Sequence, residues 1–153
     1  MHQEDIHIAK KQLADYIESK QLRKNPKRFT ILEHIYSFEE SHFSIDALFE
    51  YMQKQGCKIS RATLYNTINL LLDAKLVRKL LFLQDVAVCK YERAVDKKTH
   101  HHYVCNICGR IQDLRDDGSI STAIQTRRIA KFKQTGFSLC IYGICSACAK
   151  AAQ

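Results

Sequence analysis

The sequence predicts an α+β fold in two parts: a helical N-terminal domain that ends in a pair of strands, and a small C-terminal α/β domain closed by a metal. Three observations predict it. Helical patterns occupy residues 4–72, strand-like runs follow them, and two Cys-x-x-Cys pairs lie in the last third of the chain. We expect domains at 1–92 and 99–153, with the polar residues 93–98 as a hinge.

Size and composition narrow the class of protein. A chain of 153 residues with 46% apolar residues in regular patterns is not disordered. It contains no apolar run near 18 residues and no signal peptide, so we expect a cytoplasmic protein with no membrane partner. Seven cysteines, an odd number, fit a reducing compartment better than a disulfide framework. The net charge of +8 makes polyanions plausible partners, although local clustering of basic residues is the better evidence.

Capping residues divide the N-terminal part into four helices. Residues 4–20 carry apolar side chains at the i, i+3, i+7 spacing of an amphipathic helix. The next three helices are expected to begin after Asn25, Ser44 and Ser60, and Gly56 ends the third of the four. The fourth helix has a stripe of apolar residues, which we expect to be buried: Leu64, Ile68, Leu71 and Leu72.

The opposite face of the fourth helix is polar. Arg61, Tyr65 and Asn69 follow each other at i, i+4 and i+8, and Thr63 and Asn66 lie beside them. Arg pairs well with guanine and Asn with adenine, and rings contact the thymine methyl group. A polar helix face is often only solvated surface, so this pattern predicts DNA binding only together with the elements around it.

Two strand-like runs, 76–83 and 86–91, follow the helices and are separated by Gln84 and Asp85, which predicts a hairpin. Short helices followed by a two-stranded wing describe a winged helix-turn-helix, whose last helix enters the major groove of DNA. Residues 20–28 contain five basic side chains and no acidic one. This segment is either a solvated linker or a phosphate-binding helix start.

The cysteine pairs predict a structural zinc site. Cys105 and Cys108 form one Cys-x-x-Cys pair, and Cys145 and Cys148 form the other. One such pair is equally consistent with a redox dithiol, but two pairs in a short chain supply the four thiolates of a closed tetrahedral site.

Three consecutive histidines precede the first cysteine pair. If residues 99–104 are extended, His100 and His102 share one face of the strand and His101 points to the other. Two imidazoles at i and i+2 beside a nearby carboxylate would make a second, open metal site.

The remaining C-terminal elements are less regular. Gly109 turns the chain into a short strand at 111–114, and Ser119 or Ser121 is expected to cap a helix that runs to about residue 134. A last strand alternates through Phe137, Leu139 and Ile141 before the second cysteine pair.

These features resemble the ferric uptake regulator family of dimeric, metal-dependent bacterial repressors over about residues 10–150. The resemblance rests on Ser-Arg-Ala-Thr-Leu-Tyr-Asn-Thr-Ile-Asn-Leu-Leu at 60–71, His-His-His-Tyr-Val-Cys-Asn-Ile-Cys-Gly at 100–109, and Tyr-Gly-Ile-Cys-Ser-Ala-Cys at 142–148. It implies a homodimer with a C-terminal dimerisation domain. It also implies a winged helix that binds a double-stranded DNA operator with A·T-rich inverted repeats.

The resemblance also implies roles for individual residues. The structural Zn²⁺ ligands are Cys105, Cys108, Cys145 and Cys148. The regulatory site, for Fe²⁺ or Mn²⁺ and with Zn²⁺ able to substitute in crystals, falls on His42, Glu92, His100, His102 and Asp113. Tyr65 matches the residue that contacts thymine, and Arg23 the one that reaches the minor groove. Together with the polar helix face, the expected DNA-binding residues are Arg23, Arg28, Arg61, Thr63, Tyr65 and Asn66.

The sequence departs from the family pattern at two places. Asp113 is typical of the peroxide-sensing branch, whereas Glu92 is typical of iron sensors, so both branches stay open. A further metal found in many members would fall on Thr99, His101, Ser121 and Phe137. Only His101 is a competent ligand among these, so we expect that site to be absent or weak.

The sequence leaves two alternative functions open. The first is a peroxide-sensing member of the same family. The second is a small zinc enzyme or thiol oxidoreductase that uses the histidines or one cysteine pair, which closure of both pairs around one zinc argues against. Cys57, Cys89 and Cys140 are expected to be buried free thiols, with a redox role open for the last two.

Overall fold

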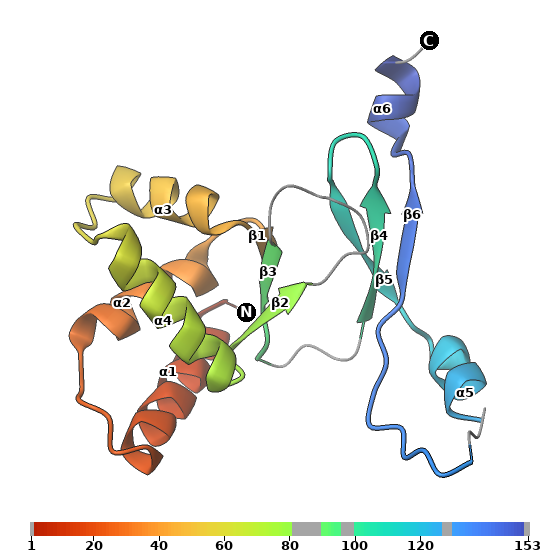
Figure 1. The fold of residues 1–153 in the computed structure, drawn as a ribbon. Helices are drawn as coiled ribbons and strands as arrows, with labels where there is room; N and C mark the ends of the chain where they lie inside the picture. Colours follow the sequence, from red (N-terminus) through yellow and green to blue (C-terminus); the bar gives the residue numbers. More distant parts are fainter. Residues whose placement is uncertain (1, 81–89, 96–99, 127–129, 152–153) are drawn as a thin grey trace. The chain divides into compact units, whose positions relative to one another are not determined.

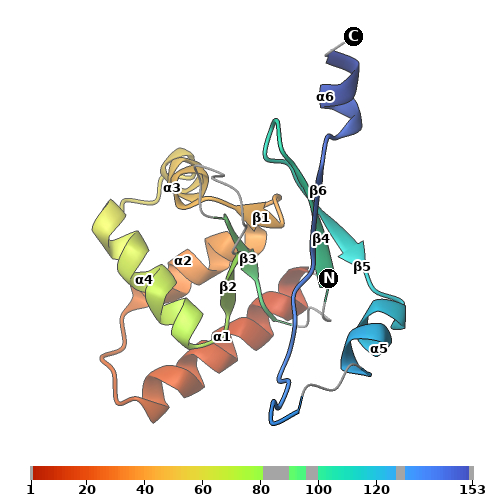
Figure 2. The same ribbon diagram turned by 45° about the vertical axis from the view of Figure 1, so that its right-hand side comes forward.

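The computed structural model describes residues 2–80, 90–95, 100–126 and 130–151, and the chain forms two compact units, 1–97 and 98–153 (Figures 1 and 2). The units are described separately below. None of the helices in the described residues is both long and apolar enough to span a bilayer.

The described residues of the first unit form four helices and a small sheet (Figure 1). Its elements are α1 (His2–Ser19), α2 (Pro26–Ser37), β1 (His42–Phe43), α3 (Ile45–Lys54), α4 (Arg61–Asp73), β2 (Val77–Leu80) and β3 (Lys90–Arg93).

The three predicted N-caps are confirmed. The side-chain oxygens of Asn25, Ser44 and Ser60 accept hydrogen bonds of 3.0 to 3.1 Å from backbone amides in the first turns of α2, α3 and α4. Gly56 follows α3 with a φ of +76°, a conformation that glycine adopts without steric cost. Local sequence therefore determines where these helices begin.

A single apolar core holds the first unit together. In α4, Leu64, Ile68 and Leu71 are fully buried as predicted, whereas Leu72 is only partly buried at the edge of the core. The other fully buried large side chains of this core include Leu13, Ile17, Ile31, Leu32, Ile35, Tyr36, Phe43, Leu48, Met52 and Leu76. Because α4 is packed along one face only, its opposite face is left exposed.

The sheet of the first unit has the order β1-β3-β2. Strands β2 and β3 pair antiparallel, as predicted for the wing, and the predicted turn at Gln84 and Asp85 lies outside the described residues. The two-residue strand β1 was not predicted, because so short a segment carries no periodic pattern. It pairs antiparallel with β3 and places His42 opposite Glu92.

Tyr36 links α2 to the junction between α4 and β2. Its hydroxyl donates a 2.8 Å hydrogen bond to the carbonyl of Leu76 and accepts one of 3.4 Å from the amide of Val95. Arg93, in β3, donates to the carbonyls of Tyr36 and Phe38 at the end of α2. Burial raises the pKa of Tyr36 to about 12, so the hydroxyl stays protonated as a donor.

We expect Tyr36→Phe to lower the free energy of unfolding by about 1 to 2 kcal/mol, since it leaves buried hydrogen-bonding groups with one partner fewer. Urea denaturation followed by circular dichroism measures the change. Tyr65→Phe is the control, because that side chain is exposed and its hydroxyl should not affect stability. Equal midpoints for both variants and the parent would show that the buried hydroxyl contributes nothing.

The second unit is built around a mixed sheet with the order β5-β4-β6. Its elements are β4 (His100–Cys105), β5 (Ile111–Arg115), α5 (Ser119–Gln125), β6 (Cys140–Gly143) and α6 (Ser146–Ala151). Strand β5 pairs antiparallel with β4, and β6 pairs parallel with β4. The parallel pairing brings the start of α6 to the end of β4 (Figure 1).

Two C-terminal predictions were wrong in extent. Helix α5 ends at Gln125 rather than near residue 134; it buries no side chain, and Lys131 has a φ of +61°, which no helix continues through. Its start is capped by Asp116 rather than by Ser119 or Ser121, since the Asp116 carboxylate accepts from the amides of Gly118, Ile120 and Ser121. The last strand begins only at Cys140, so Phe137 and Leu139 precede it.

Candidate metal sites and nucleic-acid interface

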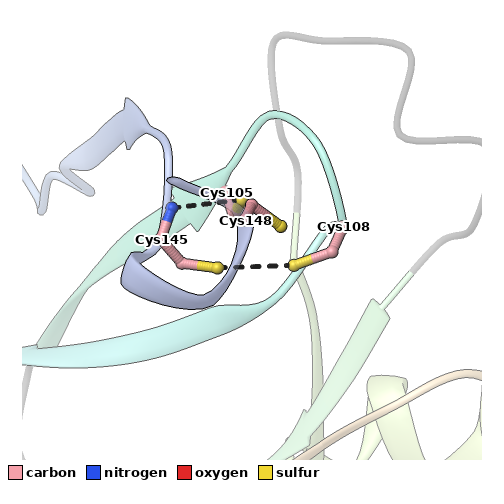
Figure 3. A group of neighbouring side chains, drawn as sticks. All are labelled: Cys105, Cys108, Cys145 and Cys148. Atoms are coloured by element: carbon pink, nitrogen blue, oxygen red, sulfur yellow. Dashed lines mark hydrogen bonds between the residues drawn. The ribbon is translucent and has the colours of Figure 1, made fainter. Parts of the chain in front are cut away.

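The four predicted zinc ligands lie together in the second unit (Figure 3). Their sulfur atoms lie within 4.8 Å of one another, and Cys108 Sγ is 3.7 Å from Cys145 Sγ. The sheet brings the four cysteines together. Strands β4 and β6 are parallel neighbours, and the Asn106 amide donates to the Gly143 carbonyl. Both Cys-x-x-Cys turns therefore lie at the same end of the sheet.

Electrostatics at this cluster favour a bound cation. The backbone amide of Cys108, with those of Cys145 and Ile107, lowers the pKa of Cys105 to about 6. Hydrogen bonding to Cys145 raises the pKa of Cys148 to about 12, because a further thiolate would face its neighbours' negative charge. A divalent ion removes that repulsion, and four sulfurs at this spacing fit tetrahedral Zn²⁺.

The second unit also holds three of the predicted regulatory ligands. His102 lies opposite Asp113 in the pairing of β4 with β5, and His100 Nε2 and His102 Nε2 lie 3.6 and 3.9 Å from Asp113 Oδ1. The rings of His100 and His102 have centroids 4.9 Å apart, whereas His101 lies against Phe137. The predicted alternation of the three histidines is confirmed. Two imidazoles and one carboxylate form a partial site of nitrogen and oxygen ligands.

The first unit holds the remaining two predicted regulatory ligands. His42 Nε2 lies 3.7 Å from Glu92 Oε2 across the pairing of β1 with β3. The Glu92 residue is only 1% exposed, and Arg78 Nη1 on β2 lies 3.9 Å from its other carboxylate oxygen. A buried carboxylate requires a cation or hydrogen-bond donors around it. This pair is therefore a second partial site, again with nitrogen and oxygen ligands.

Three of the four residues at the further metal position, His101, Ser121 and Phe137, lie among the described residues. The rings of His101 and Phe137 are tilted against each other with centroids 4.9 Å apart, and His101 Nδ1 accepts from the Leu139 amide. The nearby Asp116 carboxylate accepts from the Ser121 hydroxyl, and this hydrogen bond lowers the pKa of Asp116. Thr99 lies outside the described residues. An apolar ring and a hydroxyl already bonded to a carboxylate are poor metal donors.

The predicted DNA-binding residues of α4 differ in their exposure to solvent and in their contacts within the protein. Tyr65 is 47% exposed and Asn66 is exposed beside it. Thr63 is half-buried and hydrogen-bonded to the N-cap Ser60. The Arg61 guanidinium pairs with the carboxylate of Asp46 on α3 and lies 4.6 Å from the ring centroid of Phe49. Tyr65 and Asn66 are therefore exposed to solvent, whereas Arg61 has intramolecular partners.

The other two residues predicted to bind DNA lie around the start of α2. Arg23 and Arg28 line a recess of about 330 Å³ together with Lys24, Asn25 and Pro26. Arg28 donates a hydrogen bond to the carbonyl of Arg23, which folds the segment around the helix N-terminus. A helix start with several cationic side chains suits a phosphate group.

The other cysteines do not join a metal cluster among the described residues. Cys57 is half-buried at the edge of the first core, and Cys140 is half-buried in β6, opposite His102. Cys89 lies outside the described residues.

Three residues near these sites were missed by sequence reasoning. Arg78 and Asp46 are linked to their partners only by tertiary contacts, so no local pattern marks them. Asp116 could have been recognised, because an Asp-Asp-Gly turn before a helix is a common side-chain cap.

Comparison with known proteins agrees with the sequence motifs. The profile of the ferric uptake regulator family matches residues 19–142. The chain is 29% identical to the ferric uptake regulation protein of Bacillus subtilis, over 94% of this chain and 93% of that protein. It is 25% identical to the peroxide operon regulator of the same organism, over 92% and 93% of the two chains.

A solved structure shows the same fold. The ferric uptake regulator of Helicobacter pylori superposes with a TM-score of 0.80 at 18% identity, over 94% of this chain and 93% of that one. The predicted α+β fold is thus confirmed, with a helical DNA-binding part and a mixed-sheet domain that carries the four cysteines. The chain belongs to the ferric uptake regulator family, whose members are metal-responsive, DNA-binding transcription regulators and not enzymes.

Proposed function

We propose that the protein is a homodimeric, cytoplasmic transcriptional repressor that responds to Fe²⁺ or Mn²⁺ and controls iron-homeostasis genes. The observation that carries this proposal is that sulfur ligands and nitrogen or oxygen ligands gather at different places in the chain. Thiolates gather in one cluster, whereas imidazoles and carboxylates gather in the two partial sites. Sulfur ligands suit Zn²⁺, and an open nitrogen and oxygen site suits Fe²⁺ or Mn²⁺.

The two partial sites are proposed to act as one regulatory site. His42 and Glu92 would supply ligands from the first unit, and His100, His102 and Asp113 from the second. A divalent ion held there supplies a cross-link between the domains. Because the five side chains belong to both domains, their shared coordination would fix the angle of the winged helix, with residues 93–98 as the hinge between domains 1–92 and 99–153.

The exposed apolar surface of the second unit supports a homodimer. Among its described residues the only buried apolar side chains are Val104 and Cys105. Its exposed large apolar side chains are Tyr103, Ile107, Ile124, Phe132, Ile141 and Ile144. So small a domain with so little core needs a further apolar contact as well as the zinc. A second copy supplies that contact and places two recognition helices on an inverted repeat.

Helix α4 is proposed to read the operator. Tyr65 and Asn66 would contact base edges in the major groove, where a ring contacts the thymine methyl group and Asn pairs with adenine. Arg61 and Thr63 are proposed as contacts at the start of the same helix. Arg23 and Arg28 would bind the backbone at the recess before α2, as phosphate contacts set the position of the protein on DNA.

An anaerobic fluorescence-anisotropy titration of an A·T-rich inverted-repeat duplex, with and without Mn²⁺ at fixed salt, tests the proposal. We expect tight binding with metal only, and a loss of about tenfold or more for Tyr65→Ala, which removes a base contact. Tyr16→Ala on α1 is the control for a general effect of removing a tyrosine. Equal binding with and without metal would overturn the metal response, and no binding would overturn the DNA assignment.

Peroxide sensing is the second candidate, and Asp113 is the residue that favours it. In that case Fe²⁺ held by the regulatory ligands would lead to oxidation of a ligating histidine. Mass spectrometry of the peptides that contain His42 and residues 100–102, after peroxide treatment of the Fe²⁺ protein, separates the two candidates. A gain of one oxygen that is absent in the Mn²⁺ protein indicates a peroxide sensor.

A further inference from the structure

Glu92 lies between a metal-ligand side chain and a fixed positive charge. Its strand, β3, is the middle strand of the first sheet, so it has a partner on each side. His42 on β1 and Arg78 on β2 are both directly opposite Glu92 in the pairing. They approach different carboxylate oxygens: His42 Nε2 lies 3.7 Å from Oε2, and Arg78 Nη1 lies 3.9 Å from Oε1.

The side chains of Glu92 and Arg78 differ in their exposure to solvent. The Glu92 side chain is 2% exposed, whereas the Arg78 side chain is 43% exposed. A buried carboxylate is costly without a nearby cation, and arginine keeps its charge at every relevant pH. The guanidinium can thus leave the carboxylate at a modest cost, because the Arg78 side chain is partly exposed to solvent.

We propose that Arg78 is the counter-ion of Glu92 in the metal-free protein and that it competes with the regulatory metal for this carboxylate, which lowers the metal affinity of the site. The inference rests on the proposed function, in which Glu92 is a metal ligand. It assigns Arg78, which is not itself a ligand, as the residue that sets the metal concentration at which the protein responds.

Two opposite effects follow from this assignment. In the metal-free protein the guanidinium stabilises the buried carboxylate, so removing it lowers stability. In the metal-bound protein its positive charge would oppose a divalent ion held by the same carboxylate, so removing it would raise metal affinity. A residue with a merely structural role would weaken metal binding when it is removed, because the sheet that positions His42 and Glu92 would be disturbed. The sign of the change in affinity therefore separates the two roles.

The test compares Arg78→Gln with Lys79→Gln in the full-length, zinc-loaded protein. Lys79 is the adjacent residue, carries the same charge and lies opposite Tyr91 rather than Glu92. Free Mn²⁺ measured by electron paramagnetic resonance during titration gives the dissociation constant. We expect Arg78→Gln to bind Mn²⁺ about tenfold more tightly than the parent, because repulsion between a unit charge and a divalent ion has about this effect even under strong screening. Lys79→Gln should change the affinity by less than about twofold. Arg78→Lys, which keeps the charge, should return the affinity toward that of the parent.

The second readout is the midpoint temperature of thermal unfolding without Mn²⁺. Among the three variants, only Arg78→Gln should lower this midpoint. If the parent binds no Mn²⁺ in addition to its zinc, the proposed regulatory site itself fails. If the parent binds Mn²⁺ and Arg78→Gln binds it equally or more weakly, the counter-ion role is wrong. A tightening of the same size in Lys79→Gln or in Arg78→Lys would also overturn it, because the effect would then not depend on a charge at this position.

Discussion

Cys108→Ser is expected to remove the zinc and unfold the second unit while the first unit stays folded. Apart from the predicted ligand Cys105, the second unit buries only Val104 as an apolar side chain among its described residues, so a bound metal would supply a large part of its stability. Structural zinc contributes on the order of 10 kcal/mol in small metal-dependent domains. The first unit has its own core around Leu13, Leu32 and Leu64 and does not depend on the cluster.

Metal analysis of the purified variant should give less than about a tenth of the zinc of the parent, since three thiolates no longer close a tetrahedral site. Limited proteolysis should degrade the C-terminal part first and leave a resistant fragment that ends near residue 97, the limit of the first unit. Cys57→Ser is the matched control, because it removes a thiol at the edge of the first core. Retention of zinc in Cys108→Ser, or loss of zinc in Cys57→Ser, would contradict the four-cysteine assignment.

His102→Ala is expected to abolish the metal response while leaving the structural zinc in place. The side chain of His102 is buried, pairs with Asp113 and lies beside His100 on β4. Loss of one imidazole from a set of nitrogen and oxygen ligands should weaken Mn²⁺ binding by about 100-fold or more, since even changes to outer partners of metal ligands cost about 10- to 100-fold.

The measurements are Mn²⁺ affinity, zinc content and anisotropy with the operator duplex. Operator binding by His102→Ala at saturating Mn²⁺ should equal that of the metal-free parent, and the zinc content should not change. His7→Ala on the exposed side of α1 controls for the loss of any histidine. Parent-like Mn²⁺ affinity in His102→Ala would remove this residue from the regulatory site. Loss of zinc as well would show that the two sites are not separate.

Sequence alone predicted the features that depend on short segments. Asn25, Ser44 and Ser60 mark helix starts because each cap is made by a side chain and the amides two or three residues later. The alternation of His100, His101 and His102 follows from the period of a strand. The repeated Cys-x-x-Cys spacing indicated one closed site even though its two halves are far apart in the chain.

Predictions failed where the local pattern was weak. Strand β1 has two residues, so it exists only because β3 is there to pair with it. Helix α5 stops at Gln125 because it has no buried face that would extend it beyond its capped first turn. Propensity sets the start of such a helix, whereas tertiary packing sets its length.

By itself, then, the sequence determined the two-part architecture, the two Cys-x-x-Cys pairs and the polar face of α4, since each of these is encoded in short local patterns. Only the tertiary structure decided which side chains those residues meet. Pairing across the first sheet places Arg78 and His42 on either side of Glu92, and packing of α3 against α4 gives Arg61 the carboxylate of Asp46 as a partner. Charges brought together from distant segments leave no periodic signal in the chain, because strand register and helix packing, not sequence spacing, set their distances.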